Sequence, residues 1–271
     1  MSQCKKEHQL LGADDTPAFE VIVPRDESPV LIVCDHASNE IPAALNGLGI
    51  DQKHLQQHIA YDIGAAGVSR KMARNMGVTA VLGGFSRLVL DPNRFLTAHD
   101  SIPSISDGVV IVENETLSAT DRMLRVEELF IPYHSAINQA VTRILERYAM
   151  PLVLSVHSYT PIFQGFERPW EIGVLWEGDD GVASLLIDYL RENTDYHVGE
   201  NEPYHACNPV GYTVKTHAES FGYPHVLVEI RQDLIADEPG QEKFASLLAA
   251  ALDMIRESLA TALSPKVRAK A

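Results

Sequence analysis

The sequence contains few cysteines, and this scarcity limits the chemistry open to the chain. Only Cys4, Cys34 and Cys207 occur in 271 residues, and no two of them have the CxxC spacing of a thiolate metal site. Three scattered cysteines also argue against a disulfide framework. We therefore expect a protein of the reducing cytoplasm.

Basic residues and long apolar runs are scarce as well. The chain has 22 lysines and arginines against 37 acidic residues, a net charge of −15, so we expect no nucleic-acid partner. The net negative charge is still compatible with a small anionic substrate, because a local pocket of arginines attracts an anion at short range despite the charge of the whole chain. No apolar run approaches about 18 residues, and the first residues lack the apolar region of a signal peptide. We expect neither a membrane span nor secretion.

The chain does contain apolar runs that alternate with amphipathic stretches. Strands are predicted at 29–35, 78–84, 87–91, 151–157, 171–176, 196–201 and 225–230, and helices at 62–76, 119–149 (interrupted near Pro132), 181–193, 213–222 and 241–263. This alternation predicts an α/β fold with a mixed, mainly parallel sheet flanked by helices. No linker or repeat divides residues 1–271, so we expect one domain with an ordered core of about 20–262 and a tail at each end.

Polar residues follow or interrupt three of these predicted strands. His36 comes after the first strand, His157 ends the strand at 151–157, and Glu229 interrupts the apolar strand at 225–230. Residues at the carboxyl ends of strands form the sites of open α/β sheets. A buried carboxylate such as Glu229 needs either a metal or a partner of opposite charge. It could therefore belong to a functional metal site or, alternatively, to a structural ion-pair network with Arg231 or a histidine.

Two histidines and a carboxylate suit an open zinc site in which a second carboxylate serves as general base. His36 and His157 are the predicted nitrogen ligands, and Glu229 is the predicted base. The third ligand is either Glu40, in a loop, or Asp62, which opens a predicted helix and could instead be its N-cap. Spacing leaves that choice open. The pattern predicts a metal hydrolase.

The segment GGFSRLVLDPNR, residues 83–94, is a second group of polar residues. Arg87, Asn93 and Arg94 have the donors that bind carboxylates, and Asp91 could hold an arginine in place. The alternative is a surface turn, because DPN is typical turn sequence.

Two more residues are candidates for the wall of a substrate site. His134 lies in a predicted helical region beside Pro132, and Tyr212 follows Gly211 in a stretch that also contains His217. A kink at the proline, or a structural role for each ring, explains them equally well.

Six motifs, in this order, resemble one known family: CDHASNEIP, FSRLVLDPNR, PYH, SVHSYTP, GY and LVEIRQD. Over roughly residues 25–250 the chain looks like an N-formylglutamate amidohydrolase. SVHSYTP and VEIRQD are also distantly similar to zinc carboxypeptidases. The resemblance implies a zinc-dependent exopeptidase-like fold, with a mixed sheet of about eight strands between helices.

Carried over residue by residue, the resemblance implies one zinc ion per chain, held by His36, Asp62 and His157, with Glu229 as the base. Asp62 is favoured because the family has an aspartate just ahead of a helix at that place. The carboxypeptidase pattern would have a glutamate three residues after the first histidine. This chain has Asn39 there, which leaves Glu40 only as a fallback ligand.

The resemblance also implies that Arg87, Asn93 and Arg94 hold substrate carboxylates. Two residues depart from the better-studied members. Ser38 replaces a glycine two residues after the first histidine, and Pro92 replaces the leucine of a DLNR motif. The chain therefore resembles a side branch of the family.

The implied activity is hydrolysis of the formyl, or another small acyl, amide of an acidic N-acyl amino acid such as N-formyl-L-glutamate, within amino-acid catabolism and histidine degradation. Formate and the amino acid would be released, with Arg87 stabilising the oxyanion. We expect this small molecule as the partner of a monomer or homodimer.

Rival interpretations share part of this pattern. A zinc carboxypeptidase or an N-acyl-amino-acid amidase would have the same metal ligands. A cysteine hydrolase would use Cys34, but burial in a strand raises the pKa of a thiol. A non-catalytic sensor of an acidic metabolite would have no use for Glu229.

Overall fold

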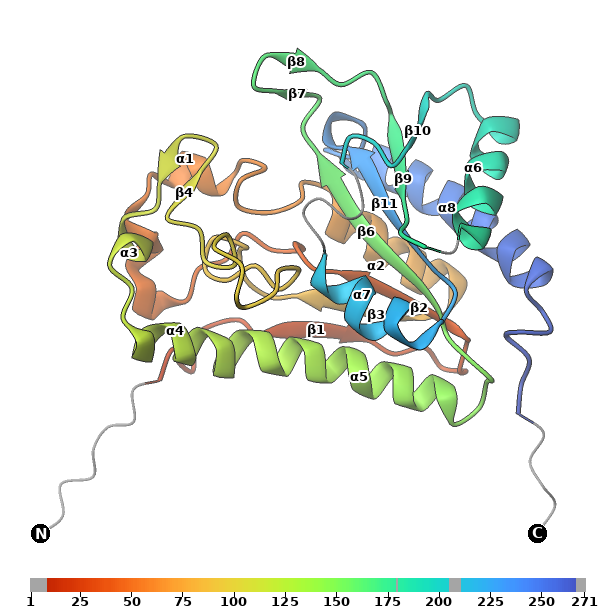
Figure 1. Cartoon of the computed structure of the whole chain (residues 1–271), viewed down its shortest axis with the longest axis horizontal. Helices are drawn as coiled ribbons and strands as arrows, with labels where there is room; N and C mark the ends of the chain where they lie inside the picture. The colour runs from red at the N-terminus through yellow and green to blue at the C-terminus, as the bar shows by residue number, and fades with distance from the viewer. Residues whose placement is uncertain (1–8, 179, 205–210, 267–271) are drawn as a thin grey trace, which may run out of the picture.

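Seven strands form one mixed sheet in the computed structural model, which describes residues 9–178, 180–204 and 211–266 (Figure 1). Their order is β1-β3-β2-β6-β11-β9-β10. β1 is antiparallel to β3 and β9 to β11, and the other adjacent pairs are parallel. Their bounds are β1 Phe19–Ile22, β2 Val30–Cys34, β3 Thr79–Gly83, β6 Leu152–Tyr159, β9 Ile172–Leu175, β10 Val198–Glu200 and β11 His225–Arg231. This is the sheet that the sequence predicts, with seven strands instead of about eight.

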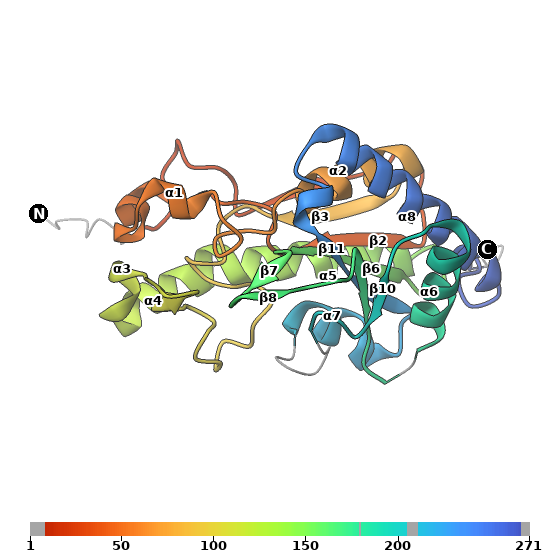
Figure 2. The same cartoon turned by 90° about the horizontal axis from the view of Figure 1, so that it is seen from above.

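Helices cover both faces of the sheet, as the view from above shows (Figure 2). Helices α2, Ala65–Met76, α6, Gly181–Asn193, and α8, Glu238–Ser258, pack on one face. The other face carries α5, Ile131–Leu145, and the short α7, Tyr212–His217. Smaller elements surround this core: α1 Gln52–Leu55, α3 Val112–Glu115, α4 Ala119–Arg125, the hairpins β4–β5 (Ile105–Ser106 and Val109–Val110) and β7–β8 (Ile162–Phe163 and Phe166–Glu167), and 3₁₀ turns at Ala43–Gly49, Glu219–Phe221 and Gln232–Leu234.

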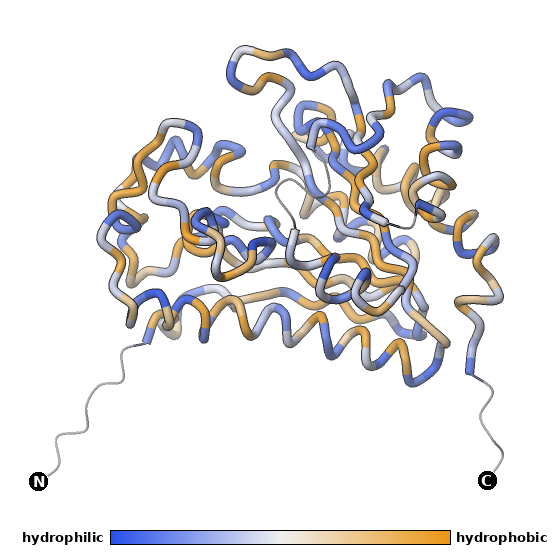
Figure 3. The backbone as a smooth tube through the Cα atoms, in the orientation of Figure 1, coloured by the Kyte–Doolittle hydropathy of each residue, from blue (hydrophilic) through white to orange (hydrophobic). Residues whose placement is uncertain are grey.

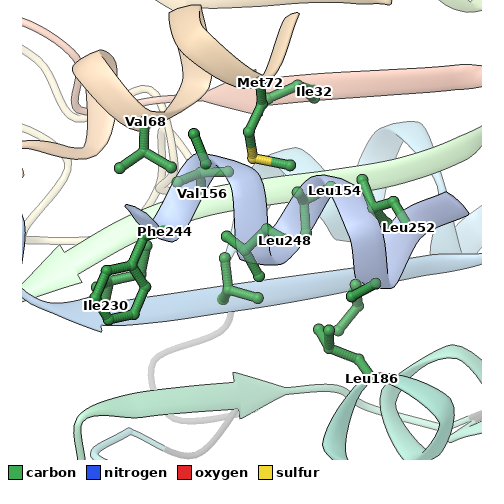
Figure 4. Packing of buried hydrophobic residues seen from close by; sticks show 14 of the residues in the cluster. Ile32, Val68, Met72, Leu154, Val156, Leu186, Ile230, Phe244, Leu248 and Leu252 are labelled. Carbon is green, nitrogen blue, oxygen red and sulfur yellow. The ribbon is translucent and has the colours of Figure 1, made fainter. Parts of the chain in front are cut away.

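The face under α2, α6 and α8 is a continuous apolar core. Side chains of a strand alternate between faces, so Ile32, Leu154 and Ile230 all point to this side. Figure 4 shows Ile32 beside Met72 of α2 and Ile230 beside Phe244 of α8. The hydropathy colouring agrees with an apolar core inside the molecule: the central strands are mainly hydrophobic, and the outer loops are mainly hydrophilic (Figure 3).

The opposite face is only half covered. Helix α5 packs against β1, β3 and β2, where Leu31, Val33 and Val81 form an apolar cluster with it. Over β11 the cover is the short helix α7. On this side the strands also present polar side chains, and a cavity lies there.

The strand expected at 87–91 is wrong. These residues form a turn, in which the N–H of Val89 donates to the carbonyl of Ser86 and the N–H of Arg87 donates to the carbonyl of Ala60. Leu88 and Val89 are fully buried. A short apolar run therefore reported burial correctly but not backbone conformation.

The helical region 119–149 is not broken at Pro132. Between α4 and α5 the chain forms a π-helical turn, Val126–Phe130, and the N–H of Ile131 bonds the carbonyl of Val126. A proline inside a helix lacks an N–H and its ring crowds the carbonyl four residues earlier. The wider π turn just before it accommodates the ring and keeps the helical axis continuous.

Part of the stretch expected as an N-terminal tail is packed. Leu10 is buried, and the N–H groups of Leu10 and Leu11 donate to the Glu128 carboxylate at 2.8 and 2.9 Å. Cys4, Cys207 and residues 208–210 lie outside the described residues. No described helix combines the length and apolar composition needed to cross a bilayer.

Leu248→Ala should destabilise the protein strongly, because Leu248 is 1% exposed in the core of α8. Cavity formation at such a site costs about 2–5 kcal/mol of the free energy of unfolding, to be measured by urea denaturation. The control is Leu247→Ala on the same helix, where the side chain is only partly buried and the loss should be smaller. Equal losses at the two positions would contradict this account of the core.

Candidate metal centre and active site

Three neighbouring parallel strands bring the polar residues of the candidate site together. His36 follows β2, His157 lies near the end of β6, and Glu229 lies on β11, where its register partner on β6 is His157. Asp62 joins them from the loop ahead of α2, because its N–H donates to the carbonyl of His36 at 2.9 Å. The fold thus gathers four side chains that are far apart in the sequence.

His36, Asp62 and His157 form a buried cluster whose potential ligand atoms all lie within 4.8 Å of one another. Asp62 Oδ2 lies 3.3 Å from Nδ1 of His36 and 2.8 Å from Nδ1 of His157. One carboxylate oxygen therefore faces both imidazole rings.

The second nitrogen of each ring also faces a carboxylate. His36 Nε2 lies 2.8 Å from Asp91 Oδ1, and His157 Nε2 lies 3.3 Å from Asp35 Oδ2. An uncharged imidazole has a single N–H, so if it donates at Nε2, its Nδ1 lone pair points at the Asp62 oxygen. A cation between them removes this conflict, and a carboxylate behind each ligating histidine is the usual support of a metal site.

The electrostatics of the cluster call for positive charge. Burial by itself lowers the pKa of His157, but Asp35 and Asp62 outweigh burial and raise it well above the ordinary value. The pKa of Asp62 is lowered, because the two histidines outweigh its burial. Two imidazole nitrogens and one carboxylate oxygen suit Zn²⁺ or a similar divalent metal.

Asp35 and Asp91 are themselves held by hydrogen bonds. The hydroxyls of Tyr133 and Thr213 donate to Asp35 Oδ1 at 2.9 and 2.6 Å, and Arg87 Nη2 donates to Asp91 Oδ2 at 2.8 Å. The sequence indicated that Asp91 could hold an arginine, and it does. The contacts of Asp35 were missed, although a carboxylate directly after a buried strand was a signal that it needed partners.

The structure separates the two candidates for the third ligand. Asp62 is not the cap of α2, since Gly64 occupies that position, and its carboxylate faces the histidines. Glu40 is exposed and is not part of the cluster.

Glu229 is buried beside the cluster without a bonding partner for Oε2 among the described residues. Burial is the main reason that its pKa rises from 4.5 to about 7. Its register partner on β9 is Gly173, where an added Cβ would lie 1.8 Å from the carbonyl oxygen of Glu202. A glycine here lets the 202–204 segment approach the sheet beside Glu229.

Arg87, Asn93 and Arg94 lie in the wall of the same cavity. Arg87 is bound by Asp91 and has its Nη1 3.5 Å from Asp62 Oδ1. Asn93 is fixed by its own N–H, which donates to Asp91 Oδ1, and by the N–H of Thr213, which donates to its Oδ1. These contacts hold the segment 83–94, which the sequence analysis identified, in place beside the His36–Asp62–His157 cluster.

His134 and Tyr212 lie outside that wall. His134 Nε2 donates to the carbonyl of Pro92 at 3.0 Å, so its Nδ1 accepts from His217 Nε2 at 2.9 Å. Tyr212 packs against the His134 ring, with 4.7 Å between the ring centroids. Both residues support the Pro92–Asn93 loop from behind, so the sequence placed them in the correct region but on the wrong side of it.

The cavity has a volume of about 220 Å³ and is lined by the cluster, Glu229 and residues of α7 and β9. Several further polar residues in its wall were not recognised in the sequence, among them His58, Tyr204, Lys215 and His225. His225 had a detectable signal, because it lies at even spacing before Glu229 on one strand and so shares its face.

A buried glutamate beside a histidine–aspartate–histidine cluster, at the strand ends of a mixed α/β sheet, is an arrangement typical of hydrolytic enzymes. The sequence profile of the N-formylglutamate amidohydrolase family matches residues 28–236. The chain belongs to this family, whose members are hydrolases of an amide bond.

Two solved structures resemble the chain over nearly its whole length. Gene product Atu2144 from Agrobacterium tumefaciens is 30% identical with a TM-score of 0.87, and the alignment covers 93% of this chain and 99% of that one. The N-formylglutamate amidohydrolase from Ralstonia eutropha JMP134 is 18% identical with a TM-score of 0.69, covering 92% and 100%. The second likeness bears on the fold alone. A search of curated proteins finds no match.

Asp62→Asn should weaken binding of a divalent metal by at least about 100-fold, since even outer partners of metal ligands contribute about 10–100-fold. The change keeps the size of the side chain and removes the charge that faces both histidines. Metal content after dialysis, and competition with a chelator, measure the effect.

The matched control is Glu40→Gln, which removes one exposed carboxylate from the same region. It should bind metal as the unaltered protein does. Loss of metal from Glu40→Gln, with retention by Asp62→Asn, would contradict the assignment of the cluster.

Glu229→Gln should stabilise the metal-free protein at alkaline pH. A carboxylate whose pKa rises from 4.5 to about 7 on folding resists ionisation, so it costs stability as pH rises through that window. The advantage of the variant should be small at pH 5 and reach about 3 kcal/mol at pH 8, measured by urea unfolding with EDTA present. Glu257→Gln, at the exposed end of α8, should show no such pH dependence. An advantage for Glu229→Gln that is equal at both pH values would refute this prediction.

Proposed function

We propose that the chain is a metal-dependent amidohydrolase that removes the formyl, or another small acyl, group from an acidic N-acyl amino acid such as N-formyl-L-glutamate. The observation that carries this proposal is Glu229, a buried carboxylate beside the His36–Asp62–His157 cluster in one cavity, whose Oε2 has no bonding partner in the described part of the chain. Membership of the N-formylglutamate amidohydrolase family supports it. We further place the reaction in cytoplasmic amino-acid catabolism, as a step of histidine degradation.

His36, Asp62 and His157 would hold the metal, which we take to be one zinc ion per chain. When bound, zinc polarises a carbonyl oxygen and lowers the pKa of water. Asp91 would keep Nδ1 of His36 directed at the ion by accepting from Nε2. Nε2 of His157 bonds Ser155 Oγ at 3.0 Å, and Asp35, whose Oδ2 lies 3.3 Å from that nitrogen, would support the ring by its charge.

Glu229 is suited to move the proton of this reaction. With a pKa raised to about 7, its carboxylate can take a proton from the attacking water and later give that proton to the departing amine. The water oxygen forms a bond to the formyl carbon, the carbon–nitrogen bond breaks, and formate and the amino acid leave.

The arginines supply positive charge on two sides of the reacting amide. Arg87, fixed by Asp91, is the donor for the negative charge that develops on the carbonyl oxygen. Arg94 uses Nε for Asp100 and Nη1 for the carbonyl of Asn93, and its Nη2, which bonds none of the described residues, is available for a substrate carboxylate. Asn93 lies beside it as a neutral donor.

A cysteine nucleophile does not fit this site. Cys34 is fully buried on the sheet face that packs against α2 and α8, opposite to the cavity. Burial also raises the pKa of its thiol far above the ordinary value. A carboxypeptidase or a broader N-acyl-amino-acid amidase would use the same cluster, so substrate comparison decides between them.

Purified protein loaded with zinc should release formate from N-formyl-L-glutamate. Glu229→Gln should lower kcat by about 10²–10⁴-fold, the usual contribution of a general acid–base group, and should still contain zinc. Formate release and metal content are measured on the same sample.

Cys34→Ala is the control and should retain both zinc and activity. Zinc binding without hydrolysis of N-formyl-L-glutamate or of its analogues with longer acyl groups would refute the proposed amidohydrolase activity. Full activity in Glu229→Gln would refute the role of Glu229. Release of C-terminal residues from peptides would instead favour the carboxypeptidase alternative.

A further inference from the structure

Arg168 is a buried arginine without an acidic partner among the described residues. It directly follows the β7–β8 hairpin, which projects from the end of β6 (Figure 1), and it is only 6% exposed. Its Nη1 donates to the carbonyl of Thr160 at 3.2 Å, but the ion pairs of the described arginines do not include it. A buried cation is costly unless an anion neutralises it, so this charge lacks a counter-charge.

Three aromatic rings hold the Arg168 guanidinium beside the cavity. Its Cζ lies 4.8 Å from the ring centroids of Phe163 and Tyr204, and 5.4 Å from that of Tyr159. The faces of aromatic rings attract a cation, but they do not cancel its charge. Tyr159, Thr160 and Tyr204 all line the cavity, so Arg168 lies directly behind this part of the wall.

Tyr204 offers a hydrogen-bond donor to the cavity in front of Arg168. Gly173 of β9 lets the 202–204 segment approach the sheet beside Glu229. Burial raises the pKa of Tyr204, so its hydroxyl keeps its proton at neutral pH and can donate. A carboxylate that accepts this hydrogen bond also comes under the positive field of Arg168, because charges interact strongly in a wall of low dielectric.

The lysine and arginine side chains that line the cavity in the described part of the chain already have acidic partners. Each forms at least one ion pair: Arg87 with Asp62 and Asp91, Arg94 with Asp100, and Lys215 with Glu177 and Glu219. Compared with these three side chains, Arg168 is the cation whose charge no ion pair compensates. An anionic group in the cavity can therefore neutralise Arg168 without displacing a carboxylate of the protein.

An acidic N-acyl amino acid has one carboxylate on its α-carbon and another at the end of its side chain. Arg94, with Asn93 beside it, provides for the first. We propose that Tyr204 and Arg168 form the subsite for the side-chain carboxylate, in which the hydroxyl donates to the carboxylate and the guanidinium compensates its charge from behind. This inference rests on the proposed function and identifies the residues that select an acidic side chain. Arg168 acts through Tyr204 and is therefore a positioning residue.

N-formyl-L-glutamate and N-formyl-L-glutamine test this subsite, because they have the same shape and differ in the charge of the side chain. The unaltered protein should have the higher kcat/KM for glutamate. In Arg168→Gln the ratio of kcat/KM for glutamate to that for glutamine should fall by about 10-fold or more, the usual loss for a hydrogen bond to a charged group. The fall should appear mainly in KM, because the side-chain carboxylate is bound alike before and during the reaction.

Three further variants separate this role from a merely structural one. Arg168→Lys keeps the charge and should restore part of the ratio. Tyr204→Phe keeps the ring and removes the donor, and the ratio should fall by about threefold, because the amide oxygen of glutamine also accepts this bond. Arg191→Gln, at an exposed arginine paired with Glu200, should leave the ratio unchanged. Partial unfolding of a variant lowers both rates together and cancels in the ratio.

An unchanged ratio in Arg168→Gln or in Tyr204→Phe, or a preference of the unaltered protein for glutamine, would overturn this inference while hydrolysis upheld the proposed function. Absence of hydrolysis of both compounds would instead contradict the proposed function. In that case calorimetry of the zinc-loaded protein with free L-glutamate and L-glutamine, which needs no turnover, decides the inference. Tighter binding of glutamate that is weakened in Arg168→Gln supports the subsite, and equal or absent binding overturns it.

Discussion

The site depends on the single carboxylate oxygen of Asp62 that faces Nδ1 of His36 and Nδ1 of His157. Carboxylates also stand behind both rings, so the arrangement is stable only with positive charge inside it. The rest of the structure keeps these carboxylates and the two histidines in place. Parallel strands align the histidines, the loop ahead of α2 fixes Asp62, and hydroxyls of two helices hold Asp35.

The alternation of apolar strands and helices was sufficient to predict the layers of the fold, because periodicity reports burial directly. It was insufficient where buried apolar residues do not form a strand, as at Leu88 and Val89, which are buried in a turn. It also could not show the π turn before Pro132, because the accommodation of a proline depends on hydrogen-bond spacing that no pattern of residues records.

Sequence reasoning indicated that His36, His157 and Glu229 would meet, since each comes with an apolar strand. Spacing alone could not choose between Glu40 and Asp62, because that choice depends on how a loop returns to the end of β2, and only the family resemblance favoured Asp62. It placed His134 and Tyr212 near the substrate, whereas the structure places them behind the Pro92–Asn93 loop. The path of a loop in the tertiary structure decides which side chains face a cavity, and the pattern of a single sequence does not predict that path.

The two faces of the sheet have different roles, one in stability and the other in the candidate site. The face against α2, α6 and α8 carries most of the apolar core, while the face toward α5 and α7 carries the cluster and the cavity. Substitutions that are far apart and share no partners add nearly independently. Thermostability could therefore be raised by repacking α2, α6 and α8, while the cavity walls are varied to accept new substrates. Such a division makes the chain a practical scaffold for engineering.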